Sequence, residues 1–269
     1  MLKQRIITAL IIAPISIACV FFMPLAWFCV FIATVIAVSA WEWANLSDFS
    51  GLHRYVYAAV IAVLMGASWF VPAEWILGPA LVWWLIALVL VIRFPALENI
   101  WSGRITRSLI GVFILVPGFV SLVQLKQSVD NNYLILLLFF IIWGADIGAY
   151  FSGRAFGKAK LAPRVSPGKS WAGFWGGMVS AIVITMALTY WLGKPDLTTQ
   201  RGVMFLAACL MVAAISVVGD LTISMFKRHR GIKDSSNLLP GHGGFLDRLD
   251  SLFAAGPAFS LFVLMFGWV

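Results

Sequence analysis

A short polar stretch near the C-terminus carries most of the chemistry that this sequence offers. Residues 227–251 read KRHRGIKDSSNLLPGHGGFLDRLDS and hold five Lys or Arg residues, three aspartates and two histidines. Clustered cations can neutralise several anionic oxygens, and glycines let a ligand approach the backbone closely. The candidate phosphate-binding residues are Lys227, Arg228, Lys233, His242, Gly243, Gly244 and Arg248.

Carboxylates flank these cations at helical spacing. Asp220, Ser224 and Lys227 stand at i, i+4 and i+7, so one helix face can present all three. Asp247 and Asp250 share a face if a helix begins with LDRLDS. Such a pattern suits a metal–phosphate site, because Mg²⁺ binds through one or two carboxylates plus substrate phosphates. The predicted metal ligands are Asp220, Asp247 and Asp250, and the predicted catalytic residues are Asp220, Lys227, Arg228, Asp247 and Arg248.

Two further acids lie inside apolar runs, Glu42 in AWEWANL and Asp146 in IIWGADIGAYFSGR. A charge within a membrane span is costly, which makes each acid a functional hypothesis. The alternative is that these acids pair with neighbouring Lys or Arg and hold helices together. We favour this structural pairing for Glu42 and place Asp146, with Ser224, among the predicted substrate-binding residues.

A second basic segment, SGRAFGKAKLAPRVSPGKSWAG at residues 152–173, contains five cations and no acid. Its Ser-Pro-Gly-Lys-Ser sequence is typical of a tight turn, whose exposed N–H groups, hydroxyls and lysine can hold a phosphate chain. The segment does not fit the P-loop pattern, because Pro163 stands where that pattern needs a glycine. We expect Ser166, Lys169 and Ser170 to bind substrate.

Together these residues suit displacement at phosphorus, in which positioning and charge neutralisation dominate. A divalent cation would bridge phosphate oxygens, while lysines and arginines stabilise the leaving group. An anionic phosphate as nucleophile needs no general base.

The rest of the chain predicts the membrane helices that position these residues. The sequence of 269 residues is 62% hydrophobic and 11% charged, with a mean hydropathy of +0.97. Apolar runs of about 20 residues recur, the length that crosses a bilayer as a helix. We predict an all-α polytopic membrane protein with about nine transmembrane helices, at residues 5–23, 25–44, 54–71, 75–92, 109–126, 132–151, 173–193, 202–226 and 251–268.

Charge predicts the orientation of this bundle. With the N-terminus in the cytoplasm, all of the 19 Lys and Arg residues except Lys126, Lys194 and Arg201 fall on the cytoplasmic side. This follows the positive-inside rule, so we expect a cytoplasmic N-terminus, an outside C-terminus and a site at the cytoplasmic face. The net charge of +8 therefore indicates anionic lipid or nucleotide phosphates and not a nucleic-acid partner.

We expect one integral membrane domain over residues 1–269. Within it, residues 1–108 form spans one to four, and residues 109–269 form the catalytic helices and cytoplasmic loops. Gly173 and Gly177 have the spacing that allows two helices to approach closely.

The polar segments of the C-terminal half resemble those of a known enzyme family. The sequence from Ser224 to Asp250, with its KR, KDSS and LPGHGGFLDRLD elements, resembles the signature of bacterial phosphatidate cytidylyltransferases, the CDP-diacylglycerol synthases. GADIGAYFSGRAFGK and SPGKSW extend the resemblance upstream. The C-terminal half matches well, and the first hundred or so residues match only in character.

The resemblance implies the reaction of CTP with phosphatidate to give CDP-diacylglycerol and pyrophosphate, at the inner face of the cytoplasmic membrane. It also implies Mg²⁺, with K⁺ as a possible second cation, a homodimer, and Asp220 and Asp247 as the metal-binding aspartates. Many relatives carry Glu or Gln where this chain has Ala172, so a role for that side chain cannot be transferred.

Two other classes of function remain open. An anion transporter also uses intramembrane acids, although here the charges lie toward one face and not at the midplane. Another membrane lipid nucleotidyltransferase or phosphotransferase, similar to a CDP-archaeol synthase or a polyprenol kinase, would share the acidic and basic elements.

Overall fold

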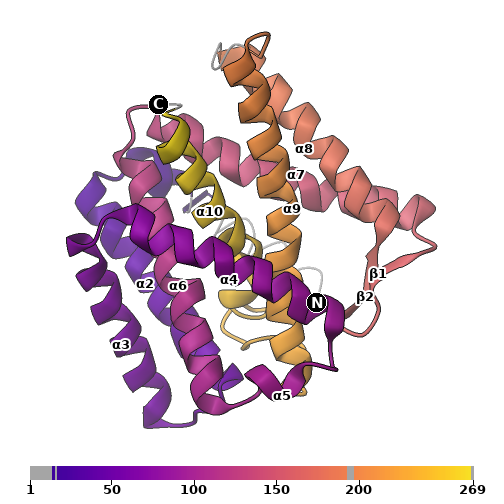
Figure 1. The fold of residues 1–269 in the computed structure, drawn as a ribbon. Coiled ribbons are helices and arrows are strands. Elements are labelled where there is room, and N and C mark those ends of the chain that lie inside the picture. The colour runs from indigo at the N-terminus through magenta and orange to yellow at the C-terminus, as the bar shows by residue number, and fades with distance from the viewer. Residues whose placement is uncertain (1–13, 16, 193–196, 268–269) are drawn as a thin grey trace.

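The protein is a bundle of long helices in the computed structural model, which describes residues 14, 15, 17–192 and 197–267 (Figure 1). Seven helices of this described part are long and apolar enough to cross a membrane. They are α2 (Leu25–Leu46), α4 (Ala73–Arg93), α6 (Arg104–Gln127), α7 (Asn131–Phe156), α8 (Trp171–Leu192), α9 (Gln200–His229) and α10 (Leu246–Phe266). The predicted all-α polytopic architecture is confirmed.

The predicted number of spans depends on two other segments. The expected span at residues 54–71 is α3 (Leu52–Ala67) followed by the 3₁₀ turn η1 (Ser68–Phe70). The 16 residues of α3 extend about 24 Å, somewhat less than a hydrocarbon core of about 30 Å. The expected first span at residues 5–23 lies mostly outside the described residues, although residues 14, 15 and 17–22 are helical. Nine spans therefore stays a prediction.

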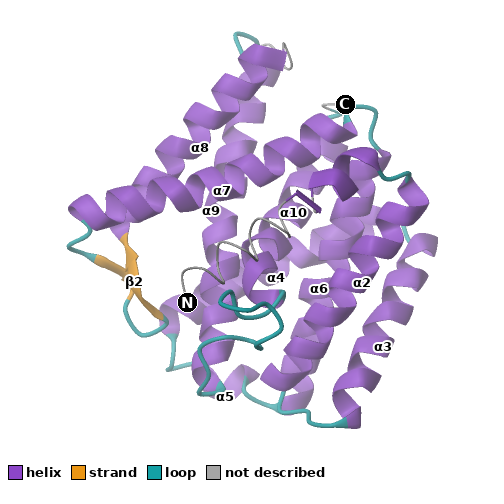
Figure 2. Ribbon diagram, turned by 180° about the vertical axis from the view of Figure 1, so that it is seen from behind, coloured by secondary structure: helices purple, strands orange, loops and turns teal. Residues whose placement is uncertain are grey.

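The α7–α8 connection contains an antiparallel hairpin, β1 (Lys160–Ala162) and β2 (Ser166–Ser170), with Ala162 opposite Ser166 and Lys160 opposite Ser170. Our expectation of a tight turn at residues 166–170 was wrong. The turn lies directly before that segment, at residues 163–165. The fixed φ of Pro163 suits a turn, and the turn does not require the backbone N–H that proline lacks. Val165, the last residue of the turn, is buried, and the chain then extends as β2 (Figure 2).

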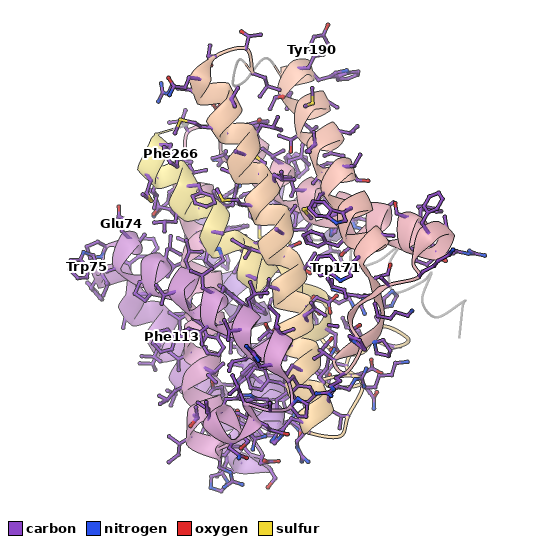
Figure 3. The ribbon with its side chains drawn as sticks, turned by 45° about the vertical axis from the view of Figure 1, so that its right-hand side comes forward. Glu74, Trp75, Phe113, Trp171, Tyr190 and Phe266 are labelled. Carbon is purple, nitrogen blue, oxygen red and sulfur yellow. The ribbon has the colours of Figure 1, made fainter. Side chains whose placement is uncertain are left out.

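The most buried helices are α6 and α10. Within the most apolar window of each, 72% of the α6 residues and 67% of the α10 residues are buried. Helix α10 packs against α9, α6, α4, α7 and α2, so it is held from several sides. Around this centre, large apolar side chains such as Trp75, Phe113 and Tyr190 are exposed (Figure 3), as expected for helices that face lipid.

Small residues bring α7 and α8 into backbone contact. A Cβ atom on Gly173 would lie 2.9 Å from the carbonyl oxygen of Ala149, and one on Gly177 would lie 2.8 Å from that of Ala145. Distances this short exclude any side chain, so the expected close approach at these two glycines is confirmed. This contact fixes the two helix ends between which the hairpin extends.

Polar contacts join the loops at one end of the bundle. Asp48, in the α2–α3 loop, pairs with Arg107 of α6 and with Arg230 after α9, whose Nε lies 3.0 Å from Asp48 Oδ1. Partial burial would raise the pKa of Asp48, but the hydrogen bond and charge of Arg107 and the charge of Arg230 outweigh it and lower that pKa. His229 contacts Glu98 of the short helix α5 (Glu98–Trp101). Segments that were predicted to share one membrane side thus lie together.

Candidate functional site

The centre of the site is a contact between α9 and the hairpin. Lys169 of β2 places its Nζ 2.6 Å from Oδ2 of Asp220, on α9. Ser224, one turn further along α9, donates a hydrogen bond of 3.2 Å to Oδ1 of the same carboxylate. The predicted common face of Asp220 and Ser224 is therefore present, and Asp220 is held between a hydroxyl and an ammonium group.

Two more carboxylates lie near Asp220. Asp250 of α10 and Asp146 of α7 both interact electrostatically with it. Gly219 permits this approach, because a Cβ atom there would lie 2.5 Å from the carbonyl oxygen of Asp250. Lys169 is close enough to interact with all three acids, so one lysine shares a cluster of carboxylates from three helices.

Asp247 occupies a different environment from Asp250. Its Oδ1 accepts a hydrogen bond of 2.7 Å from Nζ of Lys227, and both side chains are buried. Its Oδ2 accepts from the N–H and hydroxyl of Ser235 and from the N–H of Gly244, at 2.8, 3.0 and 2.9 Å. Gly243 lies beneath it with a φ of +82°, where a Cβ atom would come within 2.7 Å of Oδ2. In this arrangement Asp247 organises the loop that precedes α10.

Glu42 reaches the same loop from the N-terminal half of the chain. Its carboxylate, which is fully buried, accepts hydrogen bonds from Ser235, Ser236, the N–H of Phe245 and the N–H of Leu246. We expected Glu42 to pair with Lys or Arg, and Arg54 does interact with it electrostatically, but its hydrogen-bond partners are hydroxyls and backbone amides. The difference arises because α2 ends against the loop at residues 235–245, whose amides need acceptors.

The predicted cations of the loop surround this arrangement. Nε of Arg228 donates to the carbonyl of Val165 at 3.2 Å, and Nε of Arg248 donates to the carbonyl of His242 at 3.2 Å. Their guanidinium groups and the side chain of Lys233 are otherwise exposed and can receive an anion. Nδ1 of His242 is buried without a hydrogen-bond partner among the described residues.

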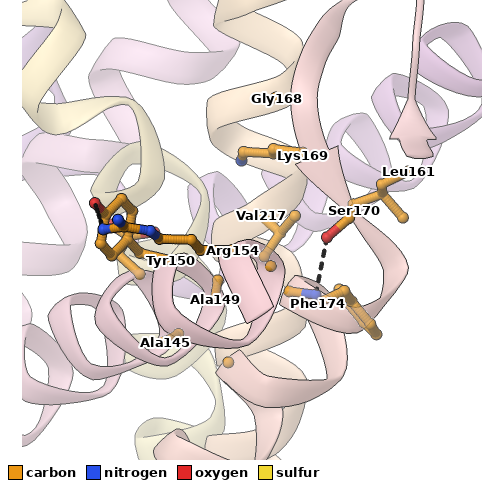
Figure 4. Close-up of a pocket in the computed structure, with 14 residues that line it drawn as sticks. Ala145, Ala149, Tyr150, Arg154, Leu161, Gly168, Lys169, Ser170, Phe174 and Val217 are labelled. Carbon is orange, nitrogen blue, oxygen red and sulfur yellow. Dashed lines mark hydrogen bonds between the residues drawn. The ribbon is translucent and has the colours of Figure 1, made fainter. Parts of the chain in front are cut away.

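A cavity of about 340 Å³, called the polar cavity below for the charged side chains in its wall, lies between α7, the hairpin and α8 (Figure 4). Asp146, Arg154, Lys169 and Ser170 line it. The hydroxyl of Ser170 accepts a hydrogen bond of 3.1 Å from the N–H of Gly173, so this predicted substrate-binding residue also caps α8. Ser166, the remaining predicted residue of the hairpin, is half-buried in β2 and is not among the lining residues.

A larger, apolar cavity of about 620 Å³ adjoins the polar one. It lies between α4, α9, the hairpin and the beginning of α8, and Arg164 is its only charged lining residue among those described. The two cavities share Leu161, Phe174 and Val217 as walls. Because its outer helices are membrane spans, this cavity can hold a hydrocarbon chain beside the charged cluster.

Comparison with known proteins identifies the family. The model of the cytidylyltransferase family matches residues 3–266. The chain belongs to the cytidylyltransferase family. A phosphatidate cytidylyltransferase of Pseudomonas aeruginosa is 50% identical over all of this chain and 99% of its own length. Those of Haemophilus influenzae and Brucella suis are 36% and 33% identical over 97% and 98% of this chain and 98% and 94% of theirs.

The carboxylates of the site differ in how well they could hold a metal ion. Within residues 14, 15, 17–192 and 197–267, no three His, Cys, Asp or Glu side chains form a ready-made metal cage. A Mg²⁺ ion needs only one or two carboxylates when phosphates supply the other ligands. Asp220 and Asp250, which interact across the α9–α10 contact, fit that requirement. Asp247 would have to bind through Oδ1, the oxygen that Lys227 now contacts.

Sequence reasoning missed the residues that hold the loop together. Ser235 bonds both Asp247 and Glu42, yet the KDSS sequence alone gives no reason to select it. Arg154, hydrogen-bonded to Tyr150 at 3.4 Å, lines the polar cavity and was counted only as a cytoplasmic cation. Its position one helical turn after Tyr150 was the available signal.

Proposed function

We propose that this protein transfers a cytidylyl group from CTP to phosphatidate, giving CDP-diacylglycerol and pyrophosphate for phospholipid synthesis. The observation that carries this proposal is the Lys169–Asp220 contact, at the polar cavity and beside Asp250. This contact places a cation and carboxylates side by side, as binding of a polyphosphate with a metal ion would need. The adjacent apolar cavity could hold the lipid. The full-length similarity to phosphatidate cytidylyltransferases supports the same reaction.

In the proposed reaction, a phosphate oxygen of phosphatidate attacks the α-phosphorus of CTP. The new P–O bond forms as the bond to the β-phosphate oxygen breaks, and pyrophosphate leaves with that electron pair. Lys169 and Lys227 neutralise charge on the CTP phosphates, and Arg228 and Arg248 orient the two anionic groups. Lys233, His242 and the Gly243–Gly244 backbone complete the nucleotide side.

Mg²⁺ is the proposed cofactor, with K⁺ as a candidate second cation. Asp220 and Asp250 would hold Mg²⁺ together with substrate phosphates, and Asp247 is the third predicted ligand. When bound, the ion would withdraw charge from the phosphate oxygens and so make the α-phosphorus easier to attack.

The lipid is proposed to enter from the membrane side. The apolar cavity would take an acyl chain, and its single charged lining residue, Arg164, would lie near the phosphate. Arg228 donates to the carbonyl of Val165 next to it, so two guanidinium groups lie at this wall. An anionic headgroup with apolar chains matches an apolar cavity with a cationic margin.

We further propose nine spans, a cytoplasmic N-terminus and an outside C-terminus in the bacterial inner membrane. The site would then face the cytoplasm, where CTP is available. The contacts that join Asp48, Arg107 and Arg230 support one shared end for the cation-rich loops. A homodimer is also proposed, on the family resemblance alone.

The test is direct assay of the purified protein. Incubation with radiolabelled CTP, phosphatidate and Mg²⁺ should yield a labelled lipid that migrates as CDP-diacylglycerol. Asp220→Asn should abolish turnover while the variant keeps its helical circular dichroism, and Glu74→Gln, which changes an exposed acid, should remain active. Wild-type protein that forms no CDP-lipid would overturn the function, and near-normal turnover by Asp220→Asn would overturn the assignment of that carboxylate.

A further inference from the structure

Glu42 is separated by nearly 200 residues from the loop that it contacts, and it holds both ends of that loop. At one end its Oε2 accepts from the hydroxyl of Ser235 at 3.2 Å, and its Oε1 accepts from that of Ser236. At the other end Oε1 accepts from the N–H of Phe245 at 3.1 Å, and Oε2 accepts from that of Leu246 at 2.6 Å. One carboxylate thus closes the segment from residue 235 to residue 246.

The two amide contacts lie at the N-terminus of α10. The first N–H groups of a helix lack partners within the helix, and an anion there is favoured by the helix dipole. The residue at the N-cap position of α10, Phe245, provides no side-chain hydrogen bond. Glu42 supplies the missing acceptor from another helix, and therefore caps α10 in trans.

The first turn of α10 is the turn that carries the site. Asp247, Arg248 and Asp250 all lie within five residues of the N–H groups that Glu42 binds. A rotation or shift of this turn would move Asp250 relative to Asp220 and would change the Lys227–Asp247 contact. Glu42 itself is held on a rigid base, because Nε1 of the adjacent Trp43 donates to the carbonyl of Arg107 at 2.9 Å.

We infer that Glu42 is a positioning residue for the cytidylyl transfer, which sets the orientation of the α10 first turn and of the loop at residues 235–245. This inference rests on the proposed function. Gly244 fits it, since a Cβ atom there would lie 2.3 Å from Oε1 of Glu42 and 2.1 Å from the hydroxyl of Ser235. The backbone at residue 244 must be bare for the carboxylate to reach its partners.

The decisive variant is Glu42→Gln, which keeps the size of the side chain. A carboxamide has one acceptor oxygen and one N–H₂ donor, so in either orientation it opposes a donor at Phe245 or at Leu246. Loss of a hydrogen bond to a charged group corresponds to about 10- to 100-fold faster amide exchange at these two positions. A displacement of about 1 Å in a site can cost about 100-fold, so kcat should fall by about that factor while KM for CTP changes less than about threefold.

The experiment compares Glu42→Gln, Ser236→Ala and the control Glu74→Gln in the full chain. Ser236→Ala removes one of the four contacts and keeps the carboxylate, so it should give a smaller fall in kcat, about threefold to tenfold. Hydrogen exchange at residues 235–246, compared with α6 and α7, is measured on the same preparations. Because it needs no turnover, it tests the positioning role even if wild-type protein were to show another activity.

The positioning role predicts local exchange changes and a kcat effect. It also predicts that the double variant Glu42→Gln/Ser236→Ala loses less kcat than the product of the two single effects. Uniformly faster exchange in all helices, with kcat unchanged per folded molecule, would mean that Glu42 only stabilises the bundle and would overturn the inference. Unchanged exchange at residues 235–246 would overturn it as well. If Glu42→Gln does not fold, Ser236→Ala decides between the same outcomes.

Discussion

The ion pair between Lys227 and Asp247 joins the end of α9 to the beginning of α10, and its removal should destabilise that junction measurably. The atoms are 2.7 Å apart, and the exposed fractions of the two side chains are 11% and 4%. At an effective dielectric constant of about 20, two charges at that distance attract by about 6 kcal/mol before the cost of desolvation. Desolvation consumes much of this, whereas removal of one partner leaves a buried charge, which costs about 3–5 kcal/mol.

We expect Lys227→Met to lower the free energy of unfolding by about 3 kcal/mol, the lower end of that range, because Ser235 and Gly244 still donate to Asp247. Asp247→Asn should cost a similar amount, since Lys227 retains the more distant charges of Asp220 and Asp250. The double variant removes both charges, so its cost should fall short of the sum by about 2 kcal/mol or more.

Free energies of unfolding would be measured by circular dichroism, with increasing sodium dodecyl sulfate in mixed micelles. The matched control is Lys158→Met, an exposed lysine, which should change the free energy of unfolding by no more than about 0.5 kcal/mol. Additivity of the two single variants within about 0.5 kcal/mol would show that Lys227 and Asp247 do not act as a pair, and would refute the reasoning.

Three further outcomes follow from the geometry of the site. Gly244→Ala should destabilise the protein by about 1–3 kcal/mol and lower turnover, since its Cβ atom would lie 2.1 Å from the hydroxyl of Ser235. Gly78→Ala, whose Cβ atom meets open space away from both cavities, should keep wild-type turnover and lose no stability in the same assays. Val218→Trp would fill the apolar cavity, so KM should rise for long-chain but not for short-chain phosphatidate in a steady-state assay with both lipids. Lys169→Met removes one of the two cations among the described residues that line the polar cavity, and it should raise KM for CTP about tenfold or more, measured by CTP titration at saturating lipid. An unchanged KM would place the nucleotide elsewhere.

The sequence predicted the helices well because their signal is local. Runs of about 20 apolar residues can lie in a bilayer only as helices, so the long spans agree with the structure to within a few residues at most ends. The face shared by Asp220 and Ser224 followed from helix geometry in the same way. Lys227, one turn further on, does contact a carboxylate, but that carboxylate is Asp247 of the next helix.

The hairpin and the role of Glu42 were beyond local reasoning. Pro-Gly inside SPGKS favours a turn, yet the turn lies at residues 163–165, beginning with Pro163 and ending with the buried Val165. An acid at the end of an apolar helix signals that it needs partners, but its sequence does not say which ones. Its actual partners are serine hydroxyls and backbone amides nearly 200 residues away, which only the packing of α2 against the loop reveals.

The arrangement of charges suggests how the proposed site could be stable both without and with a bound polyphosphate. Two of the carboxylates already pair with a lysine, Asp220 with Lys169 and Asp247 with Lys227. A buried acid without such a partner would be costly, and so would a cluster of unpaired lysines. In the proposed reaction, a nucleotide arriving with a divalent ion would bring both signs of charge. Lys169 and Lys227 could then turn to its phosphates, and Asp220 and Asp247 would become available to hold the ion. Such an exchange would keep the site close to neutral, and it would require that the backbone carrying Asp247 and Asp250 stays fixed while the lysine side chains move.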